Sequence, residues 1–168
     1  MIPLGQIHLA TALLALAAGG WVVLRPKGTT VHRRVGWVYA ASMLIMNGTA
    51  LLIYRLTGYF GPFHVAAIVS LATLIAGIIP AWRRRPVGNW IEHHYYWMAY
   101  SYLGLLAATV AETATRVPAL RVFVGGPTRR FWVAVVIATV AVFIIGGQLI
   151  RRRFEATVGP LRGRYTSG

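Results

Sequence analysis

Five long apolar stretches, separated by short polar or basic segments, divide the chain. Each is close to the length of about 20 residues that an α-helix needs to cross the hydrocarbon core of a bilayer. The pattern therefore predicts an all-α fold, a polytopic membrane helix bundle with about five transmembrane helices. The expected spans are residues 4–24, 35–54, 62–82, 93–115 and 131–150.

Proline and arginine residues mark the boundaries between these stretches. Pro26 interrupts the chain after the first span, and Pro62 suits the first turn of the third helix. The run Arg151–Arg153 is expected to end the fifth span. We therefore expect one transmembrane helical domain over residues 1–150, followed by a basic cytoplasmic tail over residues 151–168.

The composition excludes an ordinary soluble domain. Hydrophobic residues make up 57% of the chain, its mean hydropathy is +0.62, and only 12% of its residues are charged, against about a quarter in soluble domains. The net charge of +14 would suggest nucleic-acid binding in a soluble protein. Here the basic clusters flank apolar stretches, where they set topology and meet anionic headgroups, so the expected partner is the lipid bilayer and not nucleic acid.

The distribution of basic residues predicts the orientation of the chain in the membrane. Twelve of the 17 Lys and Arg residues fall on the side of the first basic turn, and five fall on the other side. The positive-inside rule then places the N-terminus outside and the C-terminus inside. The linker Arg116–Arg130, with four of those five arginines, becomes an outer segment.

The histidines sort into two layers. His8 and His64 lie near the outer ends of the first and third spans, and Glu112 of the fourth span approaches the same level. His32 and His94 lie at the inner surface. Ionisable groups at these depths are costly enough to indicate a function or a specific partner.

The fourth span carries a face that is polar at both ends and apolar between. At helical spacing this face contains His94, Met98, Ser101, Leu105, Ala108 and Glu112. His93 points about 100 degrees away from His94 on a helix. We therefore expect His94, and not His93, to join His32.

Histidines on different helices can ligate a cofactor if the fold brings them together. Neutral imidazoles from two helices can ligate a haem iron, and two histidines with a carboxylate form a facial site for a transition metal. The sequence predicts haem b or a metal held by His8 and His64, with Glu112 as a further metal ligand and a second centre at His32 and His94. The alternative is structural, with the histidines hydrogen-bonded across the bundle or solvated at the interface.

Three motifs, in order, resemble those of a widespread bacterial family of predicted membrane proteins of unknown function. They are Lys27-Gly-Thr-Thr-Val-His32-Arg, Gly61-Pro-Phe-His64 and His94-Tyr-Tyr-Trp-Met98, within a resemblance over residues 8–116. The resemblance implies an integral membrane fold in the bacterial inner membrane, with motif roles for His8, His32, His64 and His94. The chain departs from the family at His93 and in its fifth helix and basic tail.

Three functions remain from the sequence. The first is a small transmembrane redox or metal protein with an electron-transfer role, by analogy with di-haem b-type cytochromes, although paired ligands on the same helix are absent. The second is an accessory or assembly subunit of a larger membrane complex, with structural histidines and no cofactor. The third is a proton-coupled transporter using Glu112, for which no inverted repeat or interrupted helix pair is visible. No nucleotide-binding or hydrolase motif occurs, and no catalytic residue is assigned.

Overall fold

The computed structural model describes residues 3–54, 58–85, 89–116 and 129–166. These residues form five α-helices and, within those ranges, no strand, which confirms the all-α fold class. The helices are α1 (Leu4–Leu24), α2 (Thr30–Ala50), α3 (Pro62–Arg83), α4 (Trp90–Arg116) and α6 (Arg129–Thr166). Most of the expected outer linker, at residues 117–128, lies outside the described residues.

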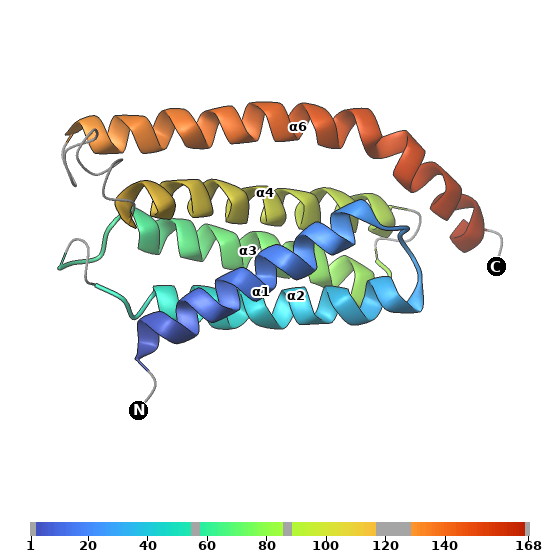
Figure 1. Cartoon of the computed structure of the whole chain (residues 1–168). Coiled ribbons are helices and arrows are strands. Elements are labelled where there is room, and N and C mark those ends of the chain that lie inside the picture. Colours follow the sequence, from blue (N-terminus) through green and yellow to red (C-terminus); the bar gives the residue numbers. More distant parts are fainter. Residues whose placement is uncertain (1–2, 55–57, 86–88, 117–128, 167–168) are drawn as a thin grey trace.

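Helices α1 to α4 form a bundle, and α6 lies along α4 on its outer side (Figure 1). Helix α4 is central, because it packs against α1, α3 and α6, while α2 packs against α1 and α3. Helix α1 begins at one end of the bundle and α6 finishes at the opposite end (Figure 1). Five helices that alternate in direction place the start of the first and the end of the last at opposite ends, as expected for five spans.

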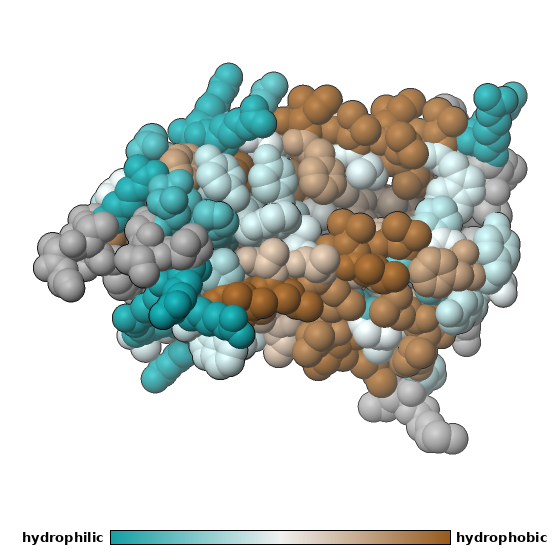
Figure 2. All heavy atoms as spheres, turned by 180° about the vertical axis from the view of Figure 1, so that it is seen from behind, coloured by the Kyte–Doolittle hydropathy of each residue, from teal (hydrophilic) through white to brown (hydrophobic). Residues whose placement is uncertain are grey.

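Three of the helices are long and apolar enough to cross a membrane: α1, α3 and the Trp132–Arg162 part of α6. Helices α2 and α4 have 21 and 27 residues, long enough for the bilayer at about 1.5 Å per residue, but they are more polar. Several of their polar side chains are buried in the bundle interior, namely Tyr39, Ser42, Asn47, Thr49 and Ser101. Apolar side chains cover much of the surface between more hydrophilic ends (Figure 2).

Small residues on α1 let three helices approach closely. Ala15 is fully buried, and a Cβ on Gly19 would overlap the ring of Tyr102 on α4. The same Cβ would lie 2.9 Å from Cε2 of Tyr39 on α2. Lipid tails are as apolar as the side chains, so such close van der Waals packing is a main source of helix association in membranes.

Helix α2 begins five residues earlier than the sequence predicted and ends at Ala50, not residue 54. Thr29 is the reason, because its hydroxyl oxygen accepts a hydrogen bond from the backbone N–H of His32 at 3.0 Å and caps the helix. His32 is therefore part of the first turn of α2. This fixes its side chain relative to the rest of the bundle.

Helix α6 continues far beyond its expected end. The helix does not end at Ile150 as expected, because it runs on to Thr166 and includes most of the predicted tail 151–168. The exposed Arg151–Arg153 do not end it, since arginine is a good helix former whose charged end reaches solvent.

The second half of α6 bends toward the bundle end where α4 begins (Figure 1). The Tyr95 hydroxyl donates a hydrogen bond to the Ile150 carbonyl at 2.9 Å. The ring of Tyr96 stacks on that of Phe154, with centroids 4.9 Å apart. Pro160 lies within this part of the helix. Aromatic side chains of α4 thus hold the C-terminal part of α6 against the bundle.

Candidate functional site

His32 and His94 meet at the basic end of the bundle. His32 lies in the first turn of α2 and His94 in the second turn of α4. Their ring centroids are 6.3 Å apart, and the ring planes are nearly perpendicular at 88°. The tertiary fold therefore brings together the two inner histidines that the sequence paired.

Hydrogen bonding sets the tautomer of one of these rings. His94 Nδ1 lies 2.8 Å from the Gly77 carbonyl oxygen, and because that oxygen can only accept, Nδ1 carries the proton. Nε2 of the neutral His94 ring then keeps its lone pair, the arrangement that backbone carbonyls impose on ligating histidines. His32 Nδ1 is buried and, in the part of the chain that the structure describes, has no hydrogen-bond partner.

Charges near His32 favour its neutral form. It precedes the apolar part of α2, and burial lowers its pKa to about 4, with further contributions from His94, Lys27 and Arg33. Lys27 itself lies in the turn before α2, and burial followed by the positive charge of Arg153 lowers its pKa. Since metals bind neutral imidazole, His32 is in the ligating form at neutral pH.

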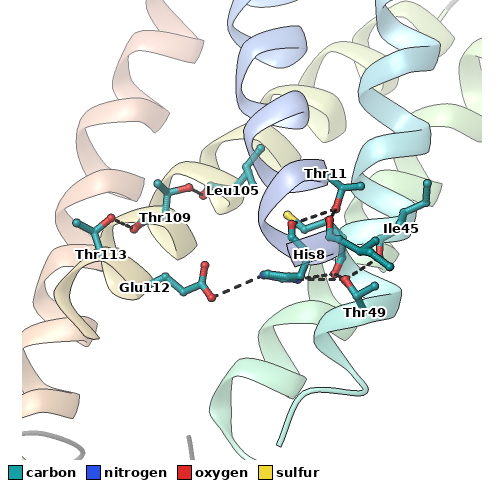
Figure 3. A network of polar contacts seen from close by, with 10 residues as sticks. His8, Thr11, Ile45, Thr49, Leu105, Thr109, Glu112 and Thr113 are labelled. Carbon is teal, nitrogen blue, oxygen red and sulfur yellow. Dashed lines mark hydrogen bonds and ion pairs between the residues drawn. The ribbon is translucent and has the colours of Figure 1, made fainter. Parts of the chain in front are cut away.

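His8 joins three helices at the other end of the bundle. Its Nδ1 lies 3.1 Å from the Met46 carbonyl oxygen and 3.2 Å from Thr49 Oγ1, both on α2. Its Nε2 lies 3.7 Å from a carboxylate oxygen of Glu112 on α4 (Figure 3). These contacts are of the structural kind that the sequence left open for this histidine.

His64 occupies a different environment at the same end. It is the third residue of α3, and its Nδ1 accepts a hydrogen bond from the backbone N–H of Gly61 at 3.1 Å. Its ring lies 4.5 Å from that of Tyr54 and 5.0 Å from that of Phe60, between centroids. Because Nδ1 accepts, the neutral ring carries its proton on Nε2. Within the described ranges Nε2 is buried without a partner, which costs about 1–3 kcal/mol for such a donor.

The structure thus groups the predicted site residues unequally. His32 meets His94, and His8 meets Glu112, whereas the contacts of His64 are with Gly61, Tyr54 and Phe60. Within the described part of the chain, no group of three or more His, Asp or Glu side chains is placed to hold a metal ion. The set His8, His64 and Glu112 stays a prediction.

His93 differs from its neighbour in the way the helical geometry predicts. It is exposed, and its Nδ1 lies 2.9 Å from the Asn89 carbonyl oxygen one turn earlier. It makes no contact with His32 among the described interactions. It therefore serves as a control for experiments on His94.

Two contacts near the inner pair were not foreseen from the sequence. The Gly77 carbonyl anchors His94, and an ion pair links Glu92, at the start of α4, to Arg162 of α6. A backbone carbonyl leaves no mark in a sequence, and Arg162 lies 70 residues from Glu92. The only available signal was the position of Glu92 beside the inner histidines.

The fold and the polar layers at its two ends define an all-α membrane protein of the helix-bundle class. The chain belongs to the DUF2306 family, described as predicted membrane protein, and the match covers residues 5–150. No curated protein and no solved structure matches the chain. The match extends beyond residues 8–116 into α6, so the expectation that the fifth helix departs from the family is wrong as far as residue 150.

Proposed function

We propose that this membrane protein binds haem b or a transition-metal ion through His32 and His94 and has a role in electron transfer. When bound, such a group supplies reversible one-electron chemistry. The residues of the chain hold and orient it, with α2 and α4 each contributing one imidazole. The His8 and His64 layer at the other end of the bundle is a proposed second location for a redox group.

The observation that carries this proposal is the pairing of two imidazole rings across helices. His94 Nδ1 is engaged by Gly77, which leaves Nε2 as the nitrogen that can ligate, and among the described residues the buried His32 Nδ1 has no partner. A centroid separation of 6.3 Å allows one metal centre to reach a nitrogen of each ring with bonds of about 2.0–2.1 Å. The neutral state of His32 supports the same role.

The outer layer supports ligation less well. His64 accepts a hydrogen bond at Nδ1, so its Nε2 carries a proton and has no lone pair for a metal unless that bond is broken. His8 Nδ1 faces a carbonyl and is therefore the protonated nitrogen, which leaves Nε2 free to ligate but directed toward Glu112. We therefore assign the first centre to the inner pair.

An absorbance spectrum with elemental analysis of the detergent-purified protein tests the proposal. Wild-type protein is expected to show a Soret band or a stoichiometric transition metal. His94→Leu and His32→Leu are each expected to remove it, whereas His93→Leu retains it because His93 is exposed. Colourless, metal-free protein from haem- and metal-replete cells, or a signal unchanged in His94→Leu, would overturn the proposal.

The second candidate is an accessory or assembly subunit of a larger membrane complex. Helix α6 favours it, because few of the residues in its apolar part are fully buried by the described chain and the helix packs mainly on α4. Its exposed side chains can meet lipid or another apolar helix. This candidate predicts that a partner copurifies with the chain and that replacing α6 surface residues releases it while the cofactor content stays the same.

The proposed location is the bacterial inner membrane, with the end of the bundle that carries Lys27 and Arg151–Arg153 on the cytoplasmic side. The support is the excess of basic residues at that end. These side chains also suit the anionic headgroups of the cytoplasmic leaflet. The orientation can be tested with single cysteines, as described below.

A further inference from the structure

We propose that His64 forms a binding site for the head group of a lipid-soluble quinone, that is, a planar ring with a carbonyl acceptor. The site lies at the start of α3, at the opposite end of the bundle from His32 and His94. A role for the quinone as electron partner rests on the proposed function, whereas binding itself does not.

His64 carries a hydrogen-bond donor that no described group engages. His64 is 4% exposed, and the N–H of Gly61 fixes Nδ1 as the acceptor, so Nε2 of the neutral ring is a donor. Nε2 is buried and has no partner among the residues that the structure describes. Buried donors are nearly always paired, and one that is not calls for an explanation such as an absent ligand. The ligand that completes this donor must carry an acceptor.

The electrostatic surroundings of His64 suit a neutral acceptor. The His64 site lies in the first turn of α3, where the helix dipole favours an electron-rich atom. The described contacts of His64 are two aromatic rings and a backbone N–H, with no Lys or Arg among them. A neutral carbonyl oxygen needs only the one donor that Nε2 supplies.

Aromatic side chains lie beside the His64 ring. Tyr54 and Phe60 lie against the His64 ring, tilted from it by 35° and 31°, and they are 44% and 53% exposed. Phe63, the residue before His64, meets Trp132 of α6 at 5.7 Å between centroids. Planar rings pack favourably on such surfaces.

The His64 site lies close to the lipid-facing surface of α3. Val65, the residue that follows His64, is 52% exposed on a helix that is apolar enough to span the membrane. The His64 site therefore adjoins a surface that lipid tails cover. A ligand that enters from the lipid reaches Nε2 by displacing the exposed rings of Tyr54 or Phe60, without crossing the bundle.

Calorimetric titration of the detergent-purified full chain with decylubiquinone, and separately with a short-chain menaquinone, tests the inference. Saturable binding to wild type is expected, weakened about tenfold or more by His64→Leu, equivalent to about 1.4 kcal/mol. His64→Gln is expected to retain part of the affinity. The glutamine side-chain oxygen can accept the hydrogen bond from the Gly61 N–H, and its NH2 group can donate one to the ligand. His93→Leu should bind as wild type does.

Phe60→Ala provides a second variant that does not depend on the buried imidazole. It removes an exposed ring, so the fold is retained while quinone affinity falls. No saturable binding to wild type, or equal affinity in wild type, His64→Leu and Phe60→Ala, overturns the inference. Equal binding of decylbenzene, which has the tail but no carbonyl, overturns it too, as does full displacement of decylubiquinone by phosphatidylglycerol.

The same preparations separate this inference from the proposed function. His94→Leu is expected to lose the haem or metal signal and to keep quinone binding, because the two sites lie at opposite ends of the bundle. A cofactor-loaded wild type that binds no quinone overturns the quinone site alone. Quinone binding by cofactor-free wild type supports the quinone site and overturns the cofactor proposal alone.

Discussion

Gly77 of α3 lies so close to Met98 of α4 that a side chain at position 77 would not fit. A Cβ on Gly77 would come within 2.6 Å of Met98 Sδ and 3.2 Å of the Met98 backbone nitrogen. His94 lies one turn before Met98 on α4, and its Nδ1 donates a hydrogen bond to the Gly77 carbonyl oxygen. The missing side chain therefore sets both the approach of α3 to α4 and the orientation of the inner histidine.

Gly77→Val is expected to lower the free energy of unfolding by about 1–3 kcal/mol, the usual range for overpacking. Met98 Sδ can move aside, but its backbone nitrogen cannot without shifting α4. Gly48→Val is the matched control, because nothing lies within 4 Å of a Cβ there and valine has a higher helix propensity than glycine. Unfolding with sodium dodecyl sulfate in mixed micelles, followed by circular dichroism, measures the difference. Equal stability of the two variants would contradict the close approach.

The hydrogen bond between Tyr39 and Ser101 links α2 to α4 in the centre of the bundle. Their hydroxyl oxygens are 3.0 Å apart, and both residues are buried. A double-mutant cycle with Tyr39→Phe and Ser101→Ala is expected to give a coupling energy of about 0.6 kcal/mol, typical of hydrogen bonds between membrane helices. The same detergent titration measures it. Additive effects of the two substitutions would show that the bond contributes nothing.

The ion pair between Glu92 and Arg162 holds the C-terminal part of α6 against the start of α4. Both side chains are partly exposed, at 29% and 39%, so Glu92→Gln should cost about 0–1 kcal/mol, and less at high salt. We expect faster tryptic cleavage of the C-terminal part of α6 in this variant at low ionic strength.

Glu155→Gln is the control for that experiment. Glu155 lies 4.0 Å from Arg162 and is 75% exposed, so its replacement should leave the cleavage rate unchanged. Cleavage that is equally fast in Glu92→Gln and Glu155→Gln, or that does not depend on salt, would argue against a specific role for Glu92.

The absence of cysteine makes the orientation directly testable. Tyr59 and Arg83 are exposed at the two ends of α3. In intact cells, a membrane-impermeant maleimide is expected to label Tyr59→Cys and to leave Arg83→Cys unlabelled until the cells are opened. The reason is that the positive-inside rule predicts a cytoplasmic position for the Arg83 end, which carries the excess of positive charge. The reverse labelling pattern would show that the N-terminus is cytoplasmic.

Much of the fold was available from the sequence because the length and apolarity of a membrane helix are local properties. The expected spans 4–24 and 62–82 agree with α1 and α3 to within a residue. The exceptions have local causes that hydropathy does not register: a Thr29 cap starts α2 early, and helix-forming arginines carry α6 past Ile150.

The candidate site was predictable only as a set of residue types at certain depths. Hydropathy placed His8 and His64 at one end and His32 and His94 at the other. Their hydrogen-bond partners were not predictable, since the tautomer of each ring depends on a carbonyl or N–H supplied by another segment.

The sequence by itself determined that this chain forms apolar helices of membrane-spanning length, with basic residues concentrated at one end, because each property depends on neighbouring residues along the chain. Only the tertiary structure decided that His32 faces His94, that Gly77 orients His94, and that His64 keeps an unpaired donor. Those outcomes depend on how each helix is rotated about its axis and how closely helices approach. That geometry is set by packing between residues far apart in the chain.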